Sequence, residues 1–152
     1  MPNRYRTILI AVDASDDADR VLTAATEFDP KGDERFHVVT VIPPMVDGVG
    51  GMAAGMLAAN WPVQEMEAAL RREITDSVRE RVARFGIPPE RVSVRYGRPA
   101  SEIQAEAERV GADLIVVGSH ARRGLARVVL GSTANGVLHG ARCDVLVIRV
   151  PE

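Results

Sequence analysis

Apolar residues gather along the chain in two kinds of segment. Five short runs are apolar throughout or alternate with polar residues, which is typical of β-strands. They cover residues 7–12, 36–42, 92–96, 113–118 and 145–150. Longer segments between the runs carry apolar residues three and four positions apart, the spacing of one helix face. These predicted helices cover residues 15–28, 63–85, 99–110 and 132–139.

Residues that interrupt regular structure mark the ends of these elements. Two prolines at 43–44 follow the second strand, because proline cannot donate to a sheet ladder. Gly86 and Gly111 follow helical segments, where glycine often ends a helix, and Pro99 stands where a helix begins. Ser15 precedes two aspartates, so we expect its hydroxyl to cap the first helix.

The strands and helices alternate along the chain. Short connections between alternating elements predict a parallel sheet with right-handed crossovers, and residues 1–152 are expected to form a single α/β domain. Ligands of such sheets bind outside the carboxyl ends of the strands, where the strand order reverses. Asp13 and the segments that follow Ile42 and Val117 are therefore the candidate ligand face.

Composition and charge exclude several classes of protein. With 19 basic and 21 acidic residues, the chain lacks the broad positive face of many nucleic-acid binders, so no nucleic-acid partner is expected. Cys143 is the single cysteine, which excludes an internal disulfide and a cysteine-rich zinc site. No run is long and apolar enough for a signal peptide or a membrane span. The expected location is the cytoplasm, away from membranes.

The segment from Gly118 to Thr133 carries the strongest chemical signal. Gly118 allows a ligand to approach the backbone closely, and Gly131 and Ser132 place free amides and a hydroxyl at a helix start. Arg122 adds positive charge nearby. From the residues alone, a phosphate site and an ordinary turn before a helix are equally good interpretations.

Three common site motifs are absent from the sequence. No G-x-G-x-x-G follows the first strand, no lysine follows Gly131 as in a Walker A loop, and there is no G-x-S-x-G of a serine hydrolase. The segment from Gly118 to Thr133 therefore does not belong to a dinucleotide-binding fingerprint, a Walker A loop or a serine hydrolase motif.

The C-terminal third resembles the universal stress protein family. The resemblance rests on residues 113–120, on Gly131 and Ser132, and on residues 143–148, while residues 8–15 resemble the family's first strand and turn. It implies a five-stranded parallel sheet in the order 3-2-1-4-5 with helices on both faces, as in Rossmann-like and adenine nucleotide α-hydrolase-like folds. It also implies a dimer and, in one branch of the family, ATP or AMP as ligand, with or without Mg²⁺.

That branch is marked by the motif G-x2-G-x9-G-[ST]. Gly118, Gly131 and Ser132 fill three of its positions, but Ala121 stands in place of the second glycine. If this position needs a positive φ, alanine costs roughly 1 kcal/mol relative to glycine. Its methyl group can also crowd a phosphate, so both a working and a disabled loop stay open.

The resemblance also assigns roles to single residues. Asp13 would hold the ribose or adenine, the backbone of Val41 would lie beside the adenine, and the amide of Thr133 would reach the phosphates. Asp13 has an alternative role as an ordinary turn or helix-cap acid. The last strand, Val145 to Val150, would form a sheet edge, and a bare apolar edge predicts a homodimer through that strand.

Three functions are compatible with this sequence. The first is a stress-response module whose ATP or AMP state alters its partners, and the second is a dimeric scaffold without nucleotide. The third is a slow ATPase or phosphotransferase, for which only Asp13 and His120 are near enough to act. Residues 43–62 are either a mobile lid or docking segment, or a tolerated surface insertion.

Overall fold

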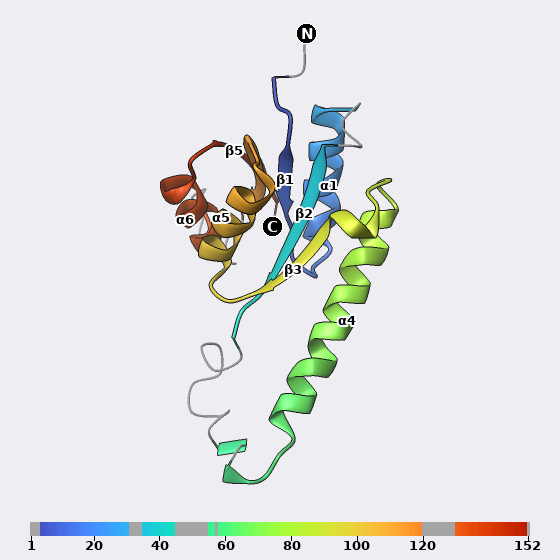
Figure 1. Cartoon of the computed structure of the whole chain (residues 1–152), viewed down its shortest axis with the longest axis vertical. Coiled ribbons are helices and arrows are strands. Elements are labelled where there is room, and N and C mark those ends of the chain that lie inside the picture. The colour runs from blue at the N-terminus through green and yellow to red at the C-terminus, as the bar shows by residue number, and fades with distance from the viewer. Residues whose placement is uncertain (1–3, 31–34, 45–54, 57, 120–129, 152) are drawn as a thin grey trace.

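A five-stranded parallel sheet forms the centre of the molecule (Figure 1). The computed structural model describes residues 4–30, 35–44, 55–56, 58–119 and 130–151. Its strands follow the order β3-β2-β1-β4-β5, and every neighbouring pair is parallel, as predicted. Their bounds are β1 Ile8–Ala11, β2 Phe36–Ile42, β3 Val92–Tyr96, β4 Leu114–Ser119 and β5 Asp144–Arg149.

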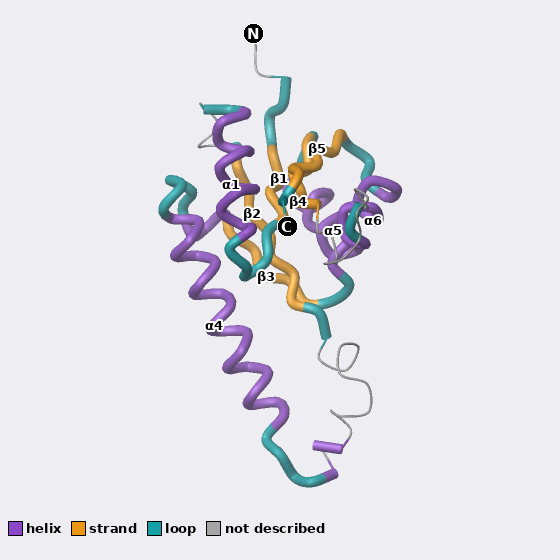
Figure 2. The backbone as a smooth tube through the Cα atoms, turned by 180° about the vertical axis from the view of Figure 1, so that it is seen from behind, coloured by secondary structure: helices purple, strands orange, loops and turns teal. Residues whose placement is uncertain are grey.

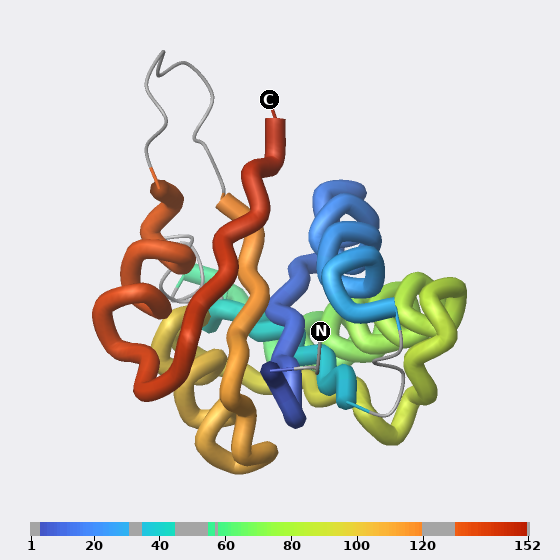
Figure 3. The backbone as a smooth tube through the Cα atoms, turned by 90° about the horizontal axis from the view of Figure 1, so that it is seen from above, coloured from blue at the N-terminus to red at the C-terminus, as the bar shows by residue number. Residues whose placement is uncertain are grey.

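Helices cover both faces of this sheet (Figure 3). Helices α1 and α4 pack on one face, and helices α5 and α6 pack on the other. A 3₁₀ turn, η1, precedes β3. The bounds are α1 Asp17–Phe28, α4 Val63–Ala83, η1 Pro89–Arg91, α5 Pro99–Val110 and α6 Ser132–Gly140.

The two helical layers explain why the first strand is apolar without interruption. Ile8 and Ile10 face α1 and α4, whereas Leu9 and Ala11 face α5 and α6, and all four are buried. Side chains of a strand alternate between faces, so a strand covered on both sides needs apolar residues at every position. Strand β1 and its neighbour β4 therefore lie at the centre of the hydrophobic core.

Helix α4 extends beyond the sheet (Figures 1 and 2). Val78 and Val82 are fully buried, but Met66 and Leu70 are each 41% exposed. These two side chains are exposed because the sheet ends before the helix does. Of the segment 43–62, residues 45–54 and 57 lie outside the described residues.

Most predicted helix ends are confirmed, with one correction. Pro99 is the first residue of α5, and Gly111, with φ 68°, ends that helix in the left-handed conformation. Ser15 does not cap α1: the capping position belongs to Asp16, and no side chain caps the helix. The hydroxyl of Ser15 donates instead to Asp13, because the turn out of β1 competes for the same group.

The strand order reverses between β1 and β4. From β1 the chain steps outward to β2 and β3, then crosses back to β4 on the other side of β1. Connections that leave two neighbouring strands in opposite directions open a crevice above their carboxyl ends. The site described next lies in that crevice.

Candidate functional site

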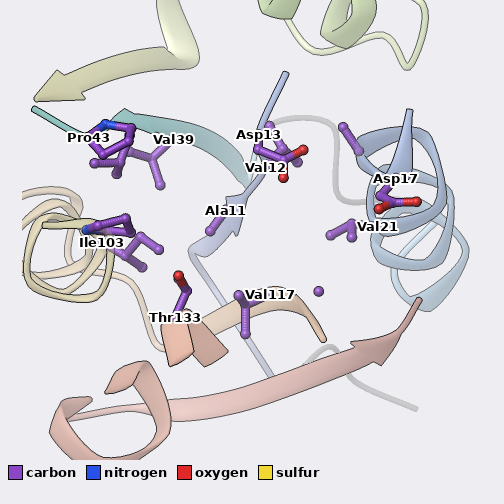
Figure 4. A pocket seen from close by; sticks show the side chains of 14 residues that line it. Ala11, Val12, Asp13, Asp17, Val21, Val39, Pro43, Ile103, Val117 and Thr133 are labelled. Atoms are coloured by element: carbon purple, nitrogen blue, oxygen red, sulfur yellow. The ribbon is translucent and has the colours of Figure 1, made fainter. Parts of the chain in front are cut away.

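A cavity of about 240 Å³ opens at the carboxyl ends of β1, β2 and β4 (Figure 4). Typical small-molecule pockets measure roughly 300–1,000 Å³, so this space suits one part of a larger ligand. The residues that line it are Ala11, Val12, Asp13, Asp17, Ala18, Val21, Val39, Val41, Pro43, Pro99, Ile103, Val117, Gly118 and Thr133.

One side of the cavity is an apolar slot. Val39 and Val41 are two positions apart on β2 and share a face, and Pro43 continues their line. Pro99 and Ile103 stand one turn apart on α5 and close the slot from the other side. Side chains without hydrogen-bonding groups on both walls favour a flat apolar ring between them.

The backbone of Val41 faces the same space. The oxygen of Ile42 accepts from the amide of Gly97 beside β3, so the neighbouring residue on β2 turns its amide and carbonyl toward β1. Strand β1, however, ends at Ala11, opposite Val39. A planar ring beyond the end of β1 could therefore meet one donor and one acceptor at Val41.

The polar side of the cavity holds two carboxylates, Asp13 and Asp17. Oδ1 of Asp13 accepts two hydrogen bonds from Ser15, one from the amide at 2.9 Å and one from the hydroxyl at 2.5 Å. This is an Asx-type turn, which fixes the carboxylate where the chain leaves β1. Asp13 is half-buried, and Figure 4 shows it across the cavity from Thr133.

Three helix N-termini meet around the cavity, and their charges differ. The first turn of α1 carries Asp17 and Asp19, and the first turn of α5 carries Glu102. The first turn of α6 holds no acid, and its side chains include the hydroxyls of Ser132 and Thr133. Unpaired amides and the helix dipole make such a start attractive to anions, and only at α6 does no carboxylate of its own first turn compete for it.

Gly118 has a packing reason to be glycine. A Cβ atom at this position would lie 3.0 Å from Cγ2 of Val21 and 3.2 Å from Cγ2 of Val150. Its φ is not in the left-handed region, so the backbone itself would accept another residue. The glycine thus lets α1 and Val150, which follows β5, pack closely over the end of β4, beside the cavity that Gly118 also lines.

The structure brings together four of the eight predicted site residues. Asp13, Val41, Gly118 and Thr133 line the cavity, and Gly131 and Ser132 begin α6 next to it. Ala121 and Arg122 lie outside the described residues, as does His120. Arg98, which follows β3, is exposed and does not line the cavity.

Sequence reasoning missed the second wall of the slot. The sequence predicts Pro99 at a helix start, Ile103 within the same helix and Val39 within a strand, with no sign that the three meet. Their spacing was a usable signal, because Val39 lies on the face of Val41 and Ile103 lies one turn after Pro99. The spacing does not show that α5 packs on β2, and this packing is what brings the two walls together.

Metal and membrane features can be assessed for part of the chain. Among the described residues, no group of three or more histidine, cysteine, aspartate or glutamate side chains could hold a metal ion. No helix in the same part of the chain is long and apolar enough to cross a membrane.

Comparisons with known proteins agree with this architecture. The sequence profile of the universal stress protein family matches residues 4–149. Universal stress protein A homolog 2 of Coxiella burnetii (strain RSA 493 / Nine Mile phase I) is 32% identical over 151 residues, which is 97% of each chain.

Solved structures extend the agreement to the fold. A universal stress protein family member from Burkholderia pseudomallei superposes with a TM-score of 0.61 at 28% identity, over 97% of this chain and 98% of that one. A universal stress protein solved in complex with cAMP gives a TM-score of 0.56 at 23% identity, over 95% and 97% of the two chains. The matched family profile, the relative and the shared fold lead to one conclusion: the chain belongs to the universal stress protein family.

Proposed function

We propose that this protein binds ATP or AMP in the cavity at the carboxyl ends of β1, β2 and β4, and acts as a cytoplasmic stress-response module. The observation that carries the proposal is the pairing of two unlike features across one crevice. An apolar slot with a backbone donor and acceptor lies on one side, and a helix start without acids lies on the other. A nucleotide has the matching pair, a flat base and an anionic phosphate.

The base would lie between Val41 and Ile103. Adenine offers an amino donor beside ring-nitrogen acceptors, which suits the amide and carbonyl of Val41. The cavity volume of about 240 Å³ accommodates the base and part of the sugar. The ribose hydroxyls would then donate to Asp13, whose position the Ser15 bonds fix.

The phosphates would lie at the start of α6. Ser132 and Thr133 have first-turn amides without partners inside the helix, and these would donate to phosphate oxygens. Mg²⁺ prefers carboxylate and phosphate oxygens, and Asp13 and Asp17 are the carboxylates that line the cavity. Because Oδ1 of Asp13 already accepts twice from Ser15, the ion would depend mainly on the phosphates.

The relatives support a nucleotide of this class. One structural neighbour was solved with cAMP, an adenine nucleotide. Its identity to this chain is 23%, so the ligand class is carried over here as part of the proposal.

We also place a homodimer at β5 in this proposal. The strand is the last of the sheet order, and its four central residues, Val145 to Ile148, are apolar and only partly buried. A scaffold that dimerises without nucleotide remains the second candidate, because Ala121 departs from the glycine motif. Slow ATP hydrolysis is the third, with Asp13, a carboxylate that lines the cavity, as the candidate base.

Calorimetric titration with ATP and AMP, with and without Mg²⁺, tests the proposal beside the variant Ala121→Gly. Micromolar binding by the natural protein is the expected result and would show that the loop tolerates alanine. Binding by the variant alone would favour the scaffold. Binding by neither protein would contradict the nucleotide site.

Hydrolysis needs a separate measurement. ADP release above the solution background, lost in Asp13→Ala, would establish the enzymatic alternative. Release that persists in Asp13→Ala would instead indicate a contaminating ATPase.

A further inference from the structure

A network of charged side chains lies beside the apolar slot, between β3 and α5. Nε of Arg95 donates to Oε2 of Glu102 at 2.6 Å, and its Nη1 donates to Oε2 of Glu106 at 3.0 Å. Glu106 also accepts from the hydroxyl of Ser93 at 2.6 Å. One guanidinium group thus joins strand β3 to two successive turns of the helix that forms a wall of the slot.

The register of the sheet places this network next to the other wall. Ser93 and Arg95 of β3 are the Cα partners of Val39 and Val41 of β2. Side chains of paired residues in neighbouring strands point to the same face, so all four face α5. Figure 4 shows Val39 across the slot from Ile103. Arg95 itself does not line the cavity, so it acts on the slot only through the elements that it holds together.

The turn between β3 and α5 makes a second link between the two walls. The amide of Gly97 donates to the oxygen of Ile42 at 3.1 Å, which fixes this turn to the end of β2. A Cβ atom on Gly97 would lie 3.0 Å from both Cγ and Oε1 of Glu102, so the glutamate packs against the glycine backbone. Glu102 is therefore a spacer between the start of α5 and a turn that is attached to β2.

Burial makes the contacts of Glu106 hard to break. Its side chain is 1% exposed, and the side chains of Arg95 and Glu102 are 29% and 26% exposed. A buried carboxylate that loses a partner carries a desolvation cost that nothing offsets. Because a shift of α5 away from β3 would break these bonds, the helix is held at one distance from the strand.

A second arginine contacts the same carboxylate from the other end of α5. Nε of Arg109 donates to Oε2 of Glu106 at 3.0 Å, and its Nη2 donates to Oε1 at 2.5 Å. Arg109 belongs to the last turn of α5, whereas Pro99 and Ile103, which line the slot, lie in the first two turns. Two arginines thus bind Glu106, but only Arg95 also holds the turn at the slot.

We propose that Arg95 is a positioning residue of the nucleotide site: with Glu102 as the spacer, it fixes the distance of α5 from β2 and so the width of the slot for the adenine ring. The inference rests on the proposed function and adds the residues that set the fit of the base. A gap of roughly 0.5–1 Å between apolar surfaces forfeits about a quarter to a half of their dispersion attraction. A small shift of α5 therefore weakens contacts with the base and leaves the phosphate contacts at α6 intact.

The two halves of AMP separate this role from general damage to the protein. Adenosine carries the base and ribose, and ribose 5-phosphate carries the sugar and phosphate. Arg95→Met keeps an apolar stem and loses both hydrogen bonds. We expect it to weaken binding of AMP and adenosine at least fivefold and to change binding of ribose 5-phosphate less than twofold, measured by NMR titration. Equal losses for adenosine and ribose 5-phosphate would overturn the positioning role.

Arg109→Met is the matched control. It removes two hydrogen bonds from the same buried carboxylate, so it should lower the free energy of unfolding in urea at least as much as Arg95→Met. Its affinities for AMP and adenosine should nevertheless stay within twofold of those of the natural protein. An equal loss of adenosine affinity in the two arginine variants would reduce the effect to lost stability and overturn the inference.

Two substitutions of Glu102 test the spacer, and they carry the test if Arg95→Met does not fold. Glu102→Gln and Glu102→Ala both remove the charge, so any electrostatic effect on the phosphate is common to both. Glutamine has the size of glutamate and can still accept from Arg95, whereas alanine leaves the space over Gly97 unfilled. Glu102→Ala should bind AMP at least fivefold more weakly than Glu102→Gln. Equal affinities in the two variants would overturn the spacer.

Failure of the nucleotide site and failure of this inference give different results. If the natural protein binds neither AMP nor adenosine, the proposed function is contradicted, whatever the variants do. Hydrogen exchange without ligand still reports on the helix: the amides of Glu102 and Ile103 should exchange at least tenfold faster in Arg95→Met and not in Arg109→Met. Natural binding of AMP with unchanged adenosine affinity or unchanged exchange in Arg95→Met overturns the positioning role alone.

Discussion

Ser15 donates both its amide and its hydroxyl to one oxygen of Asp13, at 2.9 and 2.5 Å. The two bonds turn the chain out of β1 and set the direction of the carboxylate at the rim of the cavity. Part of the side chain's hydrogen-bonding capacity is thus used in local structure. Asp13 can serve both the turn and a ligand, because the bonds from Ser15 hold its carboxylate at the wall of the cavity.

Replacement of Asp13 by asparagine separates these roles. The amide can still accept from Ser15 but has lost the charge, and hydrogen bonds to a charged group contribute about 1.5–3 kcal/mol. We expect Asp13→Asn to weaken AMP binding by about tenfold or more in calorimetry, with the free energy of unfolding within about 1 kcal/mol of the natural protein. Ser15→Ala should weaken binding less, because the amide contact survives.

Asp16→Asn is the matched control for this experiment. It stands in the same turn, is exposed, and does not line the cavity. Equal losses of affinity in Asp13→Asn and Asp16→Asn would reduce the effect to general electrostatics and remove Asp13 from the site.

Gly118 gives a prediction about stability. An added methyl group would stand 3.0 Å from Val21 and 3.2 Å from Val150, and overpacking of this kind costs typically 1–3 kcal/mol. We expect Gly118→Ala to lower the free energy of unfolding in urea by about 1 kcal/mol. Gly55→Ala is the control, since its Cβ would meet nothing within 4 Å. Unchanged stability in Gly118→Ala would show that Val21 and Val150 can move apart.

Glu106 makes the stability of the protein depend on pH. The side chain is 1% exposed and accepts hydrogen bonds from Arg109, Ser93 and Arg95. These contacts, the one with Arg109 foremost, outweigh burial and lower the pKa of Glu106 from 4.5 to about 2. The ionised form is therefore favoured by folding, with a stabilisation on the order of 3 kcal/mol above pH 4.5.

This stabilisation should disappear as the pH falls from about 4.5 to about 2, because the unfolded chain takes up the proton first. Glu106→Gln should lower stability at pH 7 and flatten its decline between pH 5 and pH 3, measured by urea unfolding. Glu108→Gln is the control, because that carboxylate is exposed and its contact with Arg142 spans 3.5 Å. Identical pH profiles for Glu106→Gln and the natural protein would contradict the assignment.

The thiol of Cys143 should react slowly in the folded protein. Burial, followed by the nearby charges of Asp144 and Asp113, raises the pKa of this cysteine above its ordinary value. Only the thiolate reacts, so we expect labelling by a disulfide reagent at pH 8 to be at least tenfold slower in the native state than in urea. Comparable rates in the two states would show that the thiol is accessible and reactive.

The sequence predicts the local features of this molecule and misses those that depend on distant partners. The runs of apolar residues located the strands, and Pro99 and Gly111 located the two ends of α5. Both signals can be read from residues that are close together in the sequence. The packing of Gly118 was not predictable, since Val150 reaches it only after β5 has paired with β4.

The turn at Ser15 was misjudged for a different reason. A serine before two aspartates suits a helix cap and an Asx turn equally well, and only the position of Asp13 at the end of β1 decides between them. The bonds of Glu106 were missed because they join a helix to a strand that precedes it by 11 and 13 residues. Nothing in the local pattern shows which helix lies on which strand.

The helix N-termini around the cavity differ in charge, and this difference makes the two ends of the cavity unlike. Carboxylates stand at the α1 side and bare amides at the α6 side, so a molecule with one neutral and one anionic end has a single favourable orientation. Dissolved salt weakens the attraction at the anionic end and leaves the apolar slot unaffected. Ionic strength should therefore tune the affinity of charged ligands while adenosine, which lacks the anion, binds weakly and equally well in dilute and concentrated salt.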